Sequence, residues 1–148
     1  MIEAADWKQA KGWRWGSFSP AEMACKEDGS LLIDEAFMDR LQALRDKLGF
    51  PLVVSSAYRT PAYNVKVSDS GPDGPHTTGH AVDLIANGPR AYAIVGAAVG
   101  LGFTGLGLSQ KGDVRARFVH LDDLPMSTTL PRPWIWTYNE PGLKGVIA

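Results

Sequence analysis

The three histidines of the chain are His76, His80 and His120, and each lies within a few residues of an aspartate. The stretch HTTGHAVD places His76 seven residues before Asp83. Gly79 and the surrounding loop composition argue against one helix that carries both residues. We therefore expect a loop histidine that folds back beside a strand carboxylate, with Gly79 allowing the reversal.

Two strand-like stretches carry the nearby carboxylates. In HAVDLIA, Asp83 would share a face with Ala81 and Ile85, because alternate side chains of a strand point to the same side. In FVHLDD, His120 and Asp122 would share a face in the same way. A carboxylate on a largely apolar face costs free energy unless it is paired, hydrogen-bonded or bound to a metal.

Two histidines and one carboxylate are a typical set of three zinc ligands, with a fourth position left for water. Zinc lowers the pKa of that water toward about 7, and a nearby carboxylate that is not a ligand can accept its proton. A histidine or aspartate in a polar loop is more often simply solvated, so the spacing alone leaves both interpretations open.

Composition favours one globular domain. The chain has 148 residues, of which 45% are hydrophobic, enough for an ordinary core. Lys and Arg number 15 against 16 Asp and Glu, which excludes a dominantly electrostatic nucleic-acid binder. The single cysteine, Cys25, excludes an intrachain disulfide framework and a zinc site of several thiolates.

The sequence predicts neither a membrane span nor a secretory signal. No stretch approaches about 18 consecutive apolar residues. The opening MIEAADWKQA carries Glu3 and Asp6 where a signal peptide would have a basic residue followed by an apolar run. We expect synthesis in the cytoplasm, in a reducing environment, with another route of delivery if the protein acts outside.

The period of the hydrophobic residues and the positions of Gly and Pro predict an α+β domain. Helices are expected at residues 20–25, 34–48, 61–67 and 88–99, so that the opening third is largely helical. Strands are expected at residues 51–58, 80–86, 103–108, 116–122 and 134–138. The last three strands are not separated by helices, which makes at least part of the sheet antiparallel. Residues 68–79 contain five Gly or Pro and are expected to form a loop.

All five tryptophans lie near the ends of the chain, at positions 7, 13, 15, 134 and 136. Trp134 and Trp136 would share one face of a strand. Stacking on glycan rings is one interpretation, but the packing of both termini in a shared core is the favoured one.

The runs SSAYRTPAYNVKV, GPHTTGHAVDL, GFTGLGL and FVHLDD resemble the zinc D-Ala-D-Ala carboxypeptidase family. That family shares its zinc site with lysostaphin-type endopeptidases and the hedgehog signalling domain. The resemblance extends from about Phe18 to Tyr138 and is greatest to the small single-domain form of phage and prophage genomes. It implies a single zinc peptidase domain over residues 1–148, with a central, mostly antiparallel sheet and helices packed on one side.

The resemblance also implies the site residues. Zn²⁺ would be bound by His76, Asp83 and His120, and Arg59 would face the substrate. The planar donors of Arg59 suit a terminal carboxylate or a carbonyl oxygen that becomes an oxyanion, with a surface ion pair as the alternative. His80 lies at a position that the family does not use for zinc. We expect it at the surface or lining the cleft, as a candidate contact to substrate.

One position departs from the family pattern. Many relatives place a Glu or Asp, as general base, three residues before the last zinc histidine, where this chain has Arg117. The remaining candidate is Asp122, either as the base or as a residue that orients a ligand or Arg59. Asp123 is expected to be a solvated turn residue.

The implied activity is hydrolysis of peptide bonds in peptidoglycan stem peptides, as a D-Ala-D-Ala carboxypeptidase or an endopeptidase. The setting would be a phage-derived lytic enzyme of the cell wall, monomeric and free or carried by the virion. Arg117 keeps a second class open: a non-catalytic, zinc-holding structural or wall-binding module of a phage particle.

Overall fold

A computed structural model describes residues 1–138 of the chain, and residues 139–148 of the expected domain lie outside this range. Its main sheet has five strands in the order β3-β4-β6-β5-β7. The strands are β3 (Val53–Ser56), β4 (Ala81–Ile85), β5 (Gly105–Ser109), β6 (Phe118–Asp122) and β7 (Trp134–Thr137). All neighbours pair antiparallel except β5 and β7, which are parallel. The predicted α+β class with a mostly antiparallel sheet is therefore confirmed.

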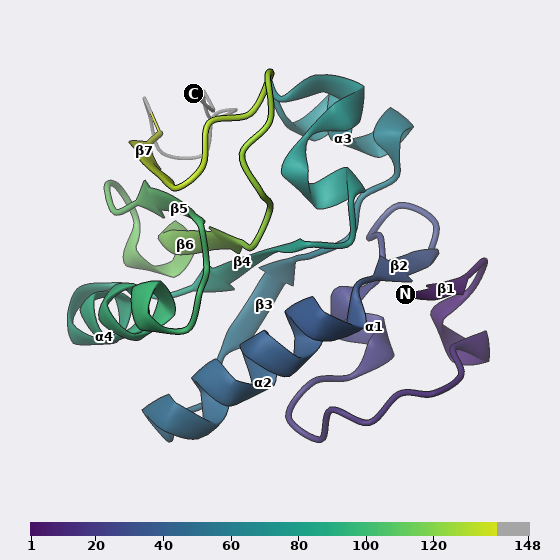
Figure 1. Cartoon of the computed structure of the whole chain (residues 1–148), viewed down its shortest axis with the longest axis horizontal. Coiled ribbons are helices and arrows are strands. Elements are labelled where there is room, and N and C mark those ends of the chain that lie inside the picture. Colours follow the sequence, from purple (N-terminus) through teal and green to yellow (C-terminus); the bar gives the residue numbers. More distant parts are fainter. Residues whose placement is uncertain (139–148) are drawn as a thin grey trace.

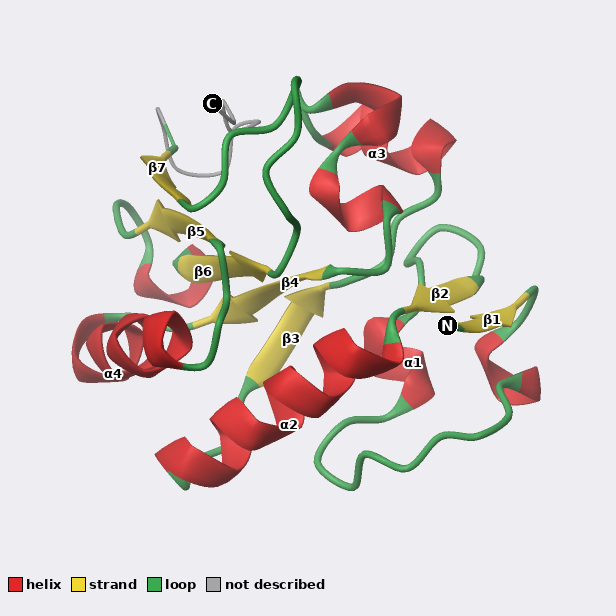
Figure 2. Ribbon diagram, viewed as in Figure 1, coloured by secondary structure: helices red, strands yellow, loops and turns green. Residues whose placement is uncertain are grey.

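Helices lie on both sides of this sheet (Figures 1 and 2). The four α-helices are α1 (Pro20–Met23), α2 (Glu35–Leu48), α3 (Pro61–Val67) and α4 (Gly88–Gly100). The two long helices, α2 and α4, pack on one face, as expected, and cover the main core. The short helix α3 and the turns that follow it rise on the opposite side. These turns include the 3-10 helices η2 (Gly71–Asp73) and η3 (Pro75–Thr77), which the expected loop did not anticipate.

The helix α2 shows how local sequence sets the scaffold. The Asp34 side chain accepts a hydrogen bond from the amide of Phe37 and caps the first turn. At the other end Gly49 adopts a φ of 73°, a left-handed conformation that ends the helix. The apolar face between the caps, which includes Leu41 and Leu44, is fully buried. Burial of each such leucine stabilises the fold by roughly 1.5–3 kcal/mol.

The N-terminal region differs from the largely helical prediction. Residues Ile2–Ala4 (β1) and Leu31–Ile33 (β2) form a separate antiparallel pair, in which Ile2 is opposite Ile33. Each strand is three residues long, too short to show a period in the sequence. Helix α1 ends at Met23, so Cys25 is buried just beyond the helix rather than on it.

The expected shared core of the two termini is wrong. The rings of Trp13 and Trp15 contact each other near the N-terminus, with centroids 5.0 Å apart. Trp136 instead lies on β7, at the far edge of the main sheet (Figure 1). The reason is topological: β7 pairs with β5, whereas the N-terminal segment pairs with β2 ahead of α2.

Among residues 1–138, the helices are too short and too polar for one of them to cross a bilayer.

Candidate metal centre

The two central strands of the sheet place Asp83 and His120 side by side. Asp83 on β4 is the register partner of His120 on β6. Their neighbours in sequence, such as Leu84 and Val119, point into the core beneath, where both are fully buried. Because side chains alternate along a strand, Asp83 and His120 face the opposite side, away from α2 and α4.

His76 reaches the same face from the turn before β4. It lies in η3, and the chain then reverses at Gly79, which has a φ of 80°. A Cβ atom at Gly79 would lie 2.9 Å from the carbonyl oxygen of Leu32, so this turn requires glycine. The predicted reversal at Gly79 is therefore present.

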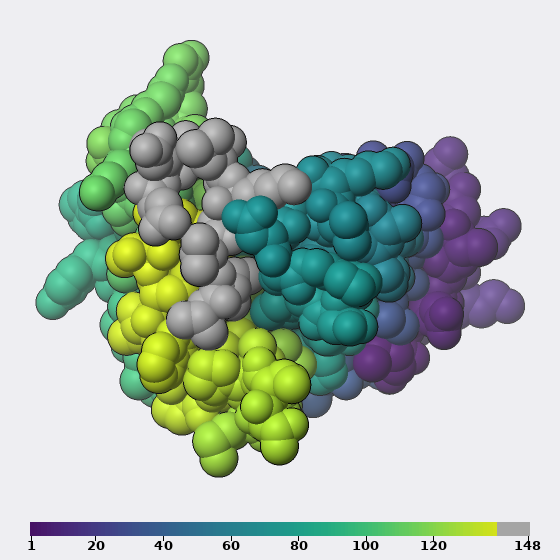
Figure 3. All heavy atoms as spheres, turned by 90° about the horizontal axis from the view of Figure 1, so that it is seen from above, coloured from purple at the N-terminus to yellow at the C-terminus, as the bar shows by residue number. Residues whose placement is uncertain are grey.

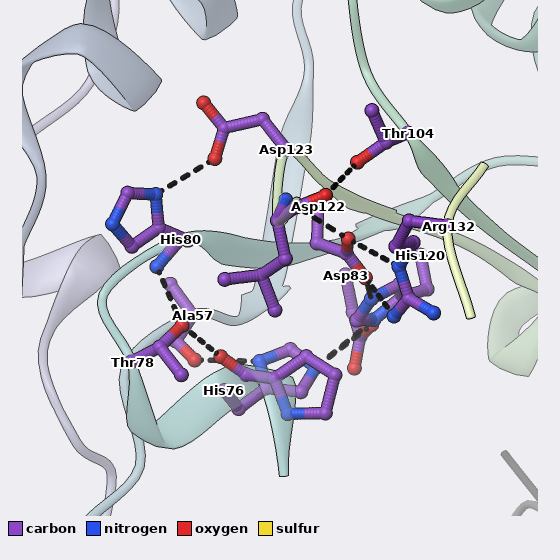
Figure 4. Close-up of polar contacts among 12 residues, drawn as sticks. Ala57, His76, Thr78, His80, Asp83, Thr104, His120, Asp122, Asp123 and Arg132 are labelled. Carbon is purple, nitrogen blue, oxygen red and sulfur yellow. Dashed lines mark hydrogen bonds and ion pairs between the residues drawn. The ribbon is translucent and has the colours of Figure 1, made fainter. Parts of the chain in front are cut away.

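The three side chains converge on one point (Figure 4). Nδ1 of His120 lies 3.0 Å from Oδ1 of Asp83 and 3.2 Å from Nε2 of His76. Nε2 of His76 lies 3.2 Å from the same Asp83 oxygen. These three atoms lie within 4.8 Å of one another, and all three residues are buried. One divalent ion could contact all of them.

The outer nitrogen of each imidazole is held by a hydrogen bond that fixes the tautomer. Nδ1 of His76 donates to the carbonyl oxygen of Ala57 at 2.6 Å. Nε2 of His120 donates to Oδ2 of Asp122 at 2.9 Å. With these protons outside, Nε2 of His76 and Nδ1 of His120 present lone pairs to the centre, as metal binding requires.

The charges of the cluster suit a cation. Burial lowers the pKa of His76, which favours the neutral imidazole. Burial alone would raise the pKa of Asp83, but His76 and His120 lower it well below its ordinary value. Burial opposes protonation of His120 too, yet hydrogen bonds with Asp122 and Asp83 raise its pKa above 6.5. When His120 carries a second proton, a metal ion must displace that proton from Nδ1.

Asp122 is enclosed on all sides. Arg132 donates to it twice, from Nε to Oδ1 at 2.8 Å and from Nη2 to Oδ2 at 2.7 Å. The amide of Leu124 adds a further donor to Oδ1. Gly105 leaves the space for this carboxylate, since a Cβ atom there would overlap it. With 0% exposure and all these donors, Asp122 is positioned to orient His120.

The electrostatics of Asp122 agree with that role. Burial would raise its pKa, but His120 and Arg132 lower it to about 2. A carboxylate with such a pKa is a weak proton acceptor near neutral pH. Of the two roles that the sequence left open for Asp122, the geometry favours the orientation of a ligand over that of general base.

Arg59 borders the cluster on the side of β3. Its Nη2 donates to Oδ2 of Asp83 at 3.2 Å, its Nε to Ser56 at 2.9 Å and its Nη1 to Asn64 at 3.1 Å. Arg59 thus turns the other oxygen of Asp83, Oδ1, toward the two histidines. Since a guanidinium has five N–H groups, two remain for a ligand.

His80 and Asp123 lie apart from this cluster. Nδ1 of His80 contacts Oδ1 of Asp123 at 2.8 Å (Figure 4). Arg40 of α2 donates to Oδ2 of Asp123. The expectation of a solvated Asp123 is therefore wrong, because its side chain is only 5% exposed. It points to the helix-covered side of the sheet, where Arg40 meets it. A contact of His80 with substrate stays a prediction.

Arg117, at the position where many relatives have an acid, binds the carbonyl oxygen of Gly112 through Nε and Nη2. Arg117 therefore stabilises a turn before β6 and supplies no carboxylate to the site.

Sequence reasoning missed Arg132 and the packing role of Trp136. The Trp136 ring lies against His120, with centroids 5.0 Å apart, and the guanidinium of Arg132 lies over its indole. Both residues were visible in PRPWIWTY, but only as part of a strand and its preceding loop. The one signal for Arg132 was the expectation that a buried Asp122 carboxylate needs a cationic partner.

The mixed sheet brings two imidazole lone pairs and a carboxylate together in a group that could hold a metal ion, an arrangement that suits a metallopeptidase. A family model places the chain more narrowly. The model described as Peptidase M15 matches residues 13–122, so the chain belongs to this family of zinc D-Ala-D-Ala carboxypeptidase-like enzymes. No curated protein matches the chain.

Proposed function

We propose that this protein is a zinc peptidase that hydrolyses peptide bonds in the stem peptides of peptidoglycan. The observation that carries the proposal is the convergence of Nε2 of His76, Oδ1 of Asp83 and Nδ1 of His120, with contacts of 3.0 to 3.2 Å. Family membership supports the peptidase class and its metal.

The donor set fits zinc. Two neutral imidazoles and one carboxylate are a common set of catalytic zinc ligands, and it leaves a position for water or substrate. When bound, Zn²⁺ would lower the pKa of a water molecule and polarise the scissile carbonyl group. The chain supplies the ligands in the required tautomers, because Ala57 holds the outer proton of His76 and Asp122 holds that of His120.

Arg59 would bind the peptide beside the metal. Its side chain is 13% exposed and keeps two N–H groups free of the partners described above. They can donate to the carbonyl oxygen that gains charge during attack, or to a terminal carboxylate. The choice between these two acceptors corresponds to the choice between endopeptidase and carboxypeptidase action.

A groove next to the centre gives an extended peptide room to lie. It has a volume of about 580 Å³ and runs between the turns that follow α3 and residues 124–130. Its lining includes Pro75, adjacent to His76, and the carboxylates Asp69 and Asp73. In Figure 3 the segment that leads into β7 lies beside the segment around α3 on this face of the molecule.

The biological setting that we propose is a phage-derived enzyme that opens the cell wall. The peptidoglycan stem peptide would be its partner, and delivery would occur after host lysis begins or as part of the virion. This part of the proposal rests on the resemblance of the sequence to phage and prophage forms.

The test is the cleavage of a defined muropeptide. Purified protein is incubated with peptidoglycan and with the pentapeptide L-Ala-γ-D-Glu-L-Lys-D-Ala-D-Ala, with zinc or with a chelator, and the fragments are identified by mass spectrometry. Release of D-Ala or of a shorter peptide that stops with chelator and with His76→Ala supports the proposal.

A non-catalytic module is the alternative that the same experiment tests. Arg117, which binds Gly112 and brings no carboxylate to the centre, is the observation in its favour. Protein that holds one zinc ion but yields no fragment from any wall type or peptide would establish this alternative and refute the peptidase.

A further inference from the structure

One buried polar atom near the metal centre has no partner. Among residues 1–138, Nε1 of Trp136 is the only buried side-chain nitrogen or oxygen without a hydrogen bond. The Trp136 side chain is 95% enclosed, with a residue exposure of 5%. Native proteins rarely leave a buried donor unpaired, because the loss of its water is then not compensated. A bound ligand is one way to supply the acceptor.

The sheet register places this donor in the same row as the candidate zinc ligands. Across the site face, His120 on β6 pairs with Gly107 on β5, which pairs with Trp136 on β7. Gly107 has no side chain, and the indole covers it: a Cβ atom there would lie 2.7 Å from Nε1. Nε1 therefore lies above the strand next to His120, at one strand spacing of about 4.8 Å.

Tyr138 adds a second donor at the same edge. It follows β7, its amide donates to the carbonyl oxygen of Leu108, and its ring packs against Phe118 with centroids 5.0 Å apart. Phe118 lies two residues before His120 and so shares the site face.

The Tyr138 hydroxyl remains protonated in this environment. Burial and the negative charge of Asp83 raise its pKa, while the Trp136 indole and Arg59 oppose the rise. A neutral hydroxyl next to an indole N–H forms a pair of donors without positive charge.

The carboxylates of the centre do not use these donors. The described hydrogen bonds of Asp83 come from Arg59, His76 and His120. Those of Asp122 come from His120, Arg132 and Leu124. The Tyr138 hydroxyl lies close to the indole, but the geometry of that contact does not satisfy the N–H of Nε1. An oxygen atom of a ligand placed between the two side chains would supply the missing acceptor.

We propose that Trp136 and Tyr138 donate hydrogen bonds to an oxygen atom of the bound stem peptide, at the end of the row opposite Arg59. Because β3 and β7 are the two edges of the sheet, Arg59 and this donor pair flank the centre from opposite sides. The acceptor is a backbone carbonyl or carboxylate oxygen of the peptide. The inference rests on the proposed peptidase function and adds two residues that contact its substrate.

Kinetics of single variants test the proposal. Tyr138→Phe removes only the hydroxyl and keeps the ring against Phe118, whereas Trp136→Phe removes the indole N–H. Each should lower kcat/KM on the pentapeptide by at least about tenfold, a smaller loss than the roughly 10²–10³ caused by removal of one donor from an oxyanion hole. Zinc content, measured by metal analysis, should stay at the wild-type value. Tyr92→Phe, on the exposed surface of α4, is the matched control and should leave kcat/KM unchanged.

A spectroscopic measurement separates contact with substrate from a purely structural role. In zinc-loaded protein labelled with ¹⁵N at its tryptophans, the Trp136 indole resonance is assigned by its loss in Trp136→Phe. Saturating pentapeptide should move this resonance downfield, and should move it less in Tyr138→Phe.

The inference would be overturned by a Trp136 resonance that does not move, or by kcat/KM within twofold of wild type in both variants. Cleavage of the pentapeptide by the wild-type protein would still support the peptidase in that case. A wild-type protein that cleaves nothing would instead refute the proposed function itself.

Discussion

Nε2 of His120 lies 2.9 Å from Oδ2 of Asp122, two residues further along the same strand. This contact is possible because alternate residues of β6 share a face, so a ligand and the group that orients it come from one short motif. Arg132 then closes the carboxylate from the other side. The late His-x-Asp of the sequence is thus one structural unit with an arginine ten residues later.

Replacement of Asp122 separates the two roles that the sequence left open. Asp122→Asn should weaken zinc binding by about 10- to 100-fold, because the neutral amide has one acceptor oxygen for His120 and Arg132 together and so holds the His120 tautomer less firmly. It should also lower the free energy of unfolding by about 3–5 kcal/mol, since Arg132 is left buried without a counter-charge. Competition with a chromogenic chelator and urea unfolding measure these effects.

A general base would give a different result for the same variant. Zinc affinity would stay unchanged while turnover fell by about a hundredfold or more. Asp113→Asn, in an exposed turn, is the control for the loss of one negative charge.

The space around Asp122 can be tested from β5. Gly105→Ala would place a methyl group where the carboxylate now lies, so we expect a loss of zinc affinity similar to that of Asp122→Asn and a lower melting temperature. Gly96→Ala in α4 is the matched control: a Cβ there meets no atom within 4 Å. That variant should be stabilised by up to about 1 kcal/mol, because alanine favours a helix. Equal melting temperatures for the two variants would contradict the packing described here.

Metal binding should stabilise the fold. Zinc at a hundred times its dissociation constant is expected to add about 2.7 kcal/mol, seen as a higher melting temperature. His76→Ala should abolish this gain, since two ligands remain. A persistent zinc-induced shift in this variant would place the metal elsewhere.

Zinc affinity should fall as the pH is lowered. The pKa of His120 is raised above 6.5 in the metal-free protein, mainly by hydrogen bonds with Asp122 and Asp83 that outweigh the effect of burial. Below that pKa a proton competes with the metal for Nδ1, so the apparent dissociation constant should increase about tenfold per pH unit. Titrations with zinc between pH 5 and 8 would show this slope, and a flat profile would contradict it.

Acid should destabilise the metal-free protein through Asp122. Its pKa is about 2 in the fold against 3.8 as the ordinary value, because His120 and Arg132 outweigh burial. Because the pKa is lower in the fold, ionised Asp122 adds to the free energy of unfolding. This contribution is fully present above pH 3.8 and is lost as the pH falls toward 2. The loss is about 2 kcal/mol for this group, measured by urea unfolding against Asp122→Asn, which should lack that part of the decline.

Much of the scaffold was predictable because it is encoded locally. Asp34 before an apolar period and Gly49 after it mark α2, and Thr60 with Pro61 marks the start of α3. The alternation of side chains along two strands correctly placed Asp83 on the same face as Ala81 and Ile85. It also placed His120 on the same face as Asp122.

The parts that escaped prediction depend on contacts distant in sequence. Asp123 was expected in solvent because strand alternation turned it away from the site, but that side is covered by α2 and Arg40. Arg132 contacts Asp122 because the chain that follows β6 crosses to the far edge of the sheet, where it forms β7. No period or spacing in a single sequence encodes such a crossing.

Because β6 is inserted between β4 and β5, while β7 is added outside β5, the centre is completed by a strand made after all its candidate metal ligands. A nascent chain that has left the ribosome only as far as residue 125 already contains His76, Asp83 and His120. It still lacks the guanidinium that neutralises Asp122 and the indole that covers Gly107. Assembly of the site is therefore coupled to the synthesis of residues 132–136, which follow all three candidate ligands in the chain.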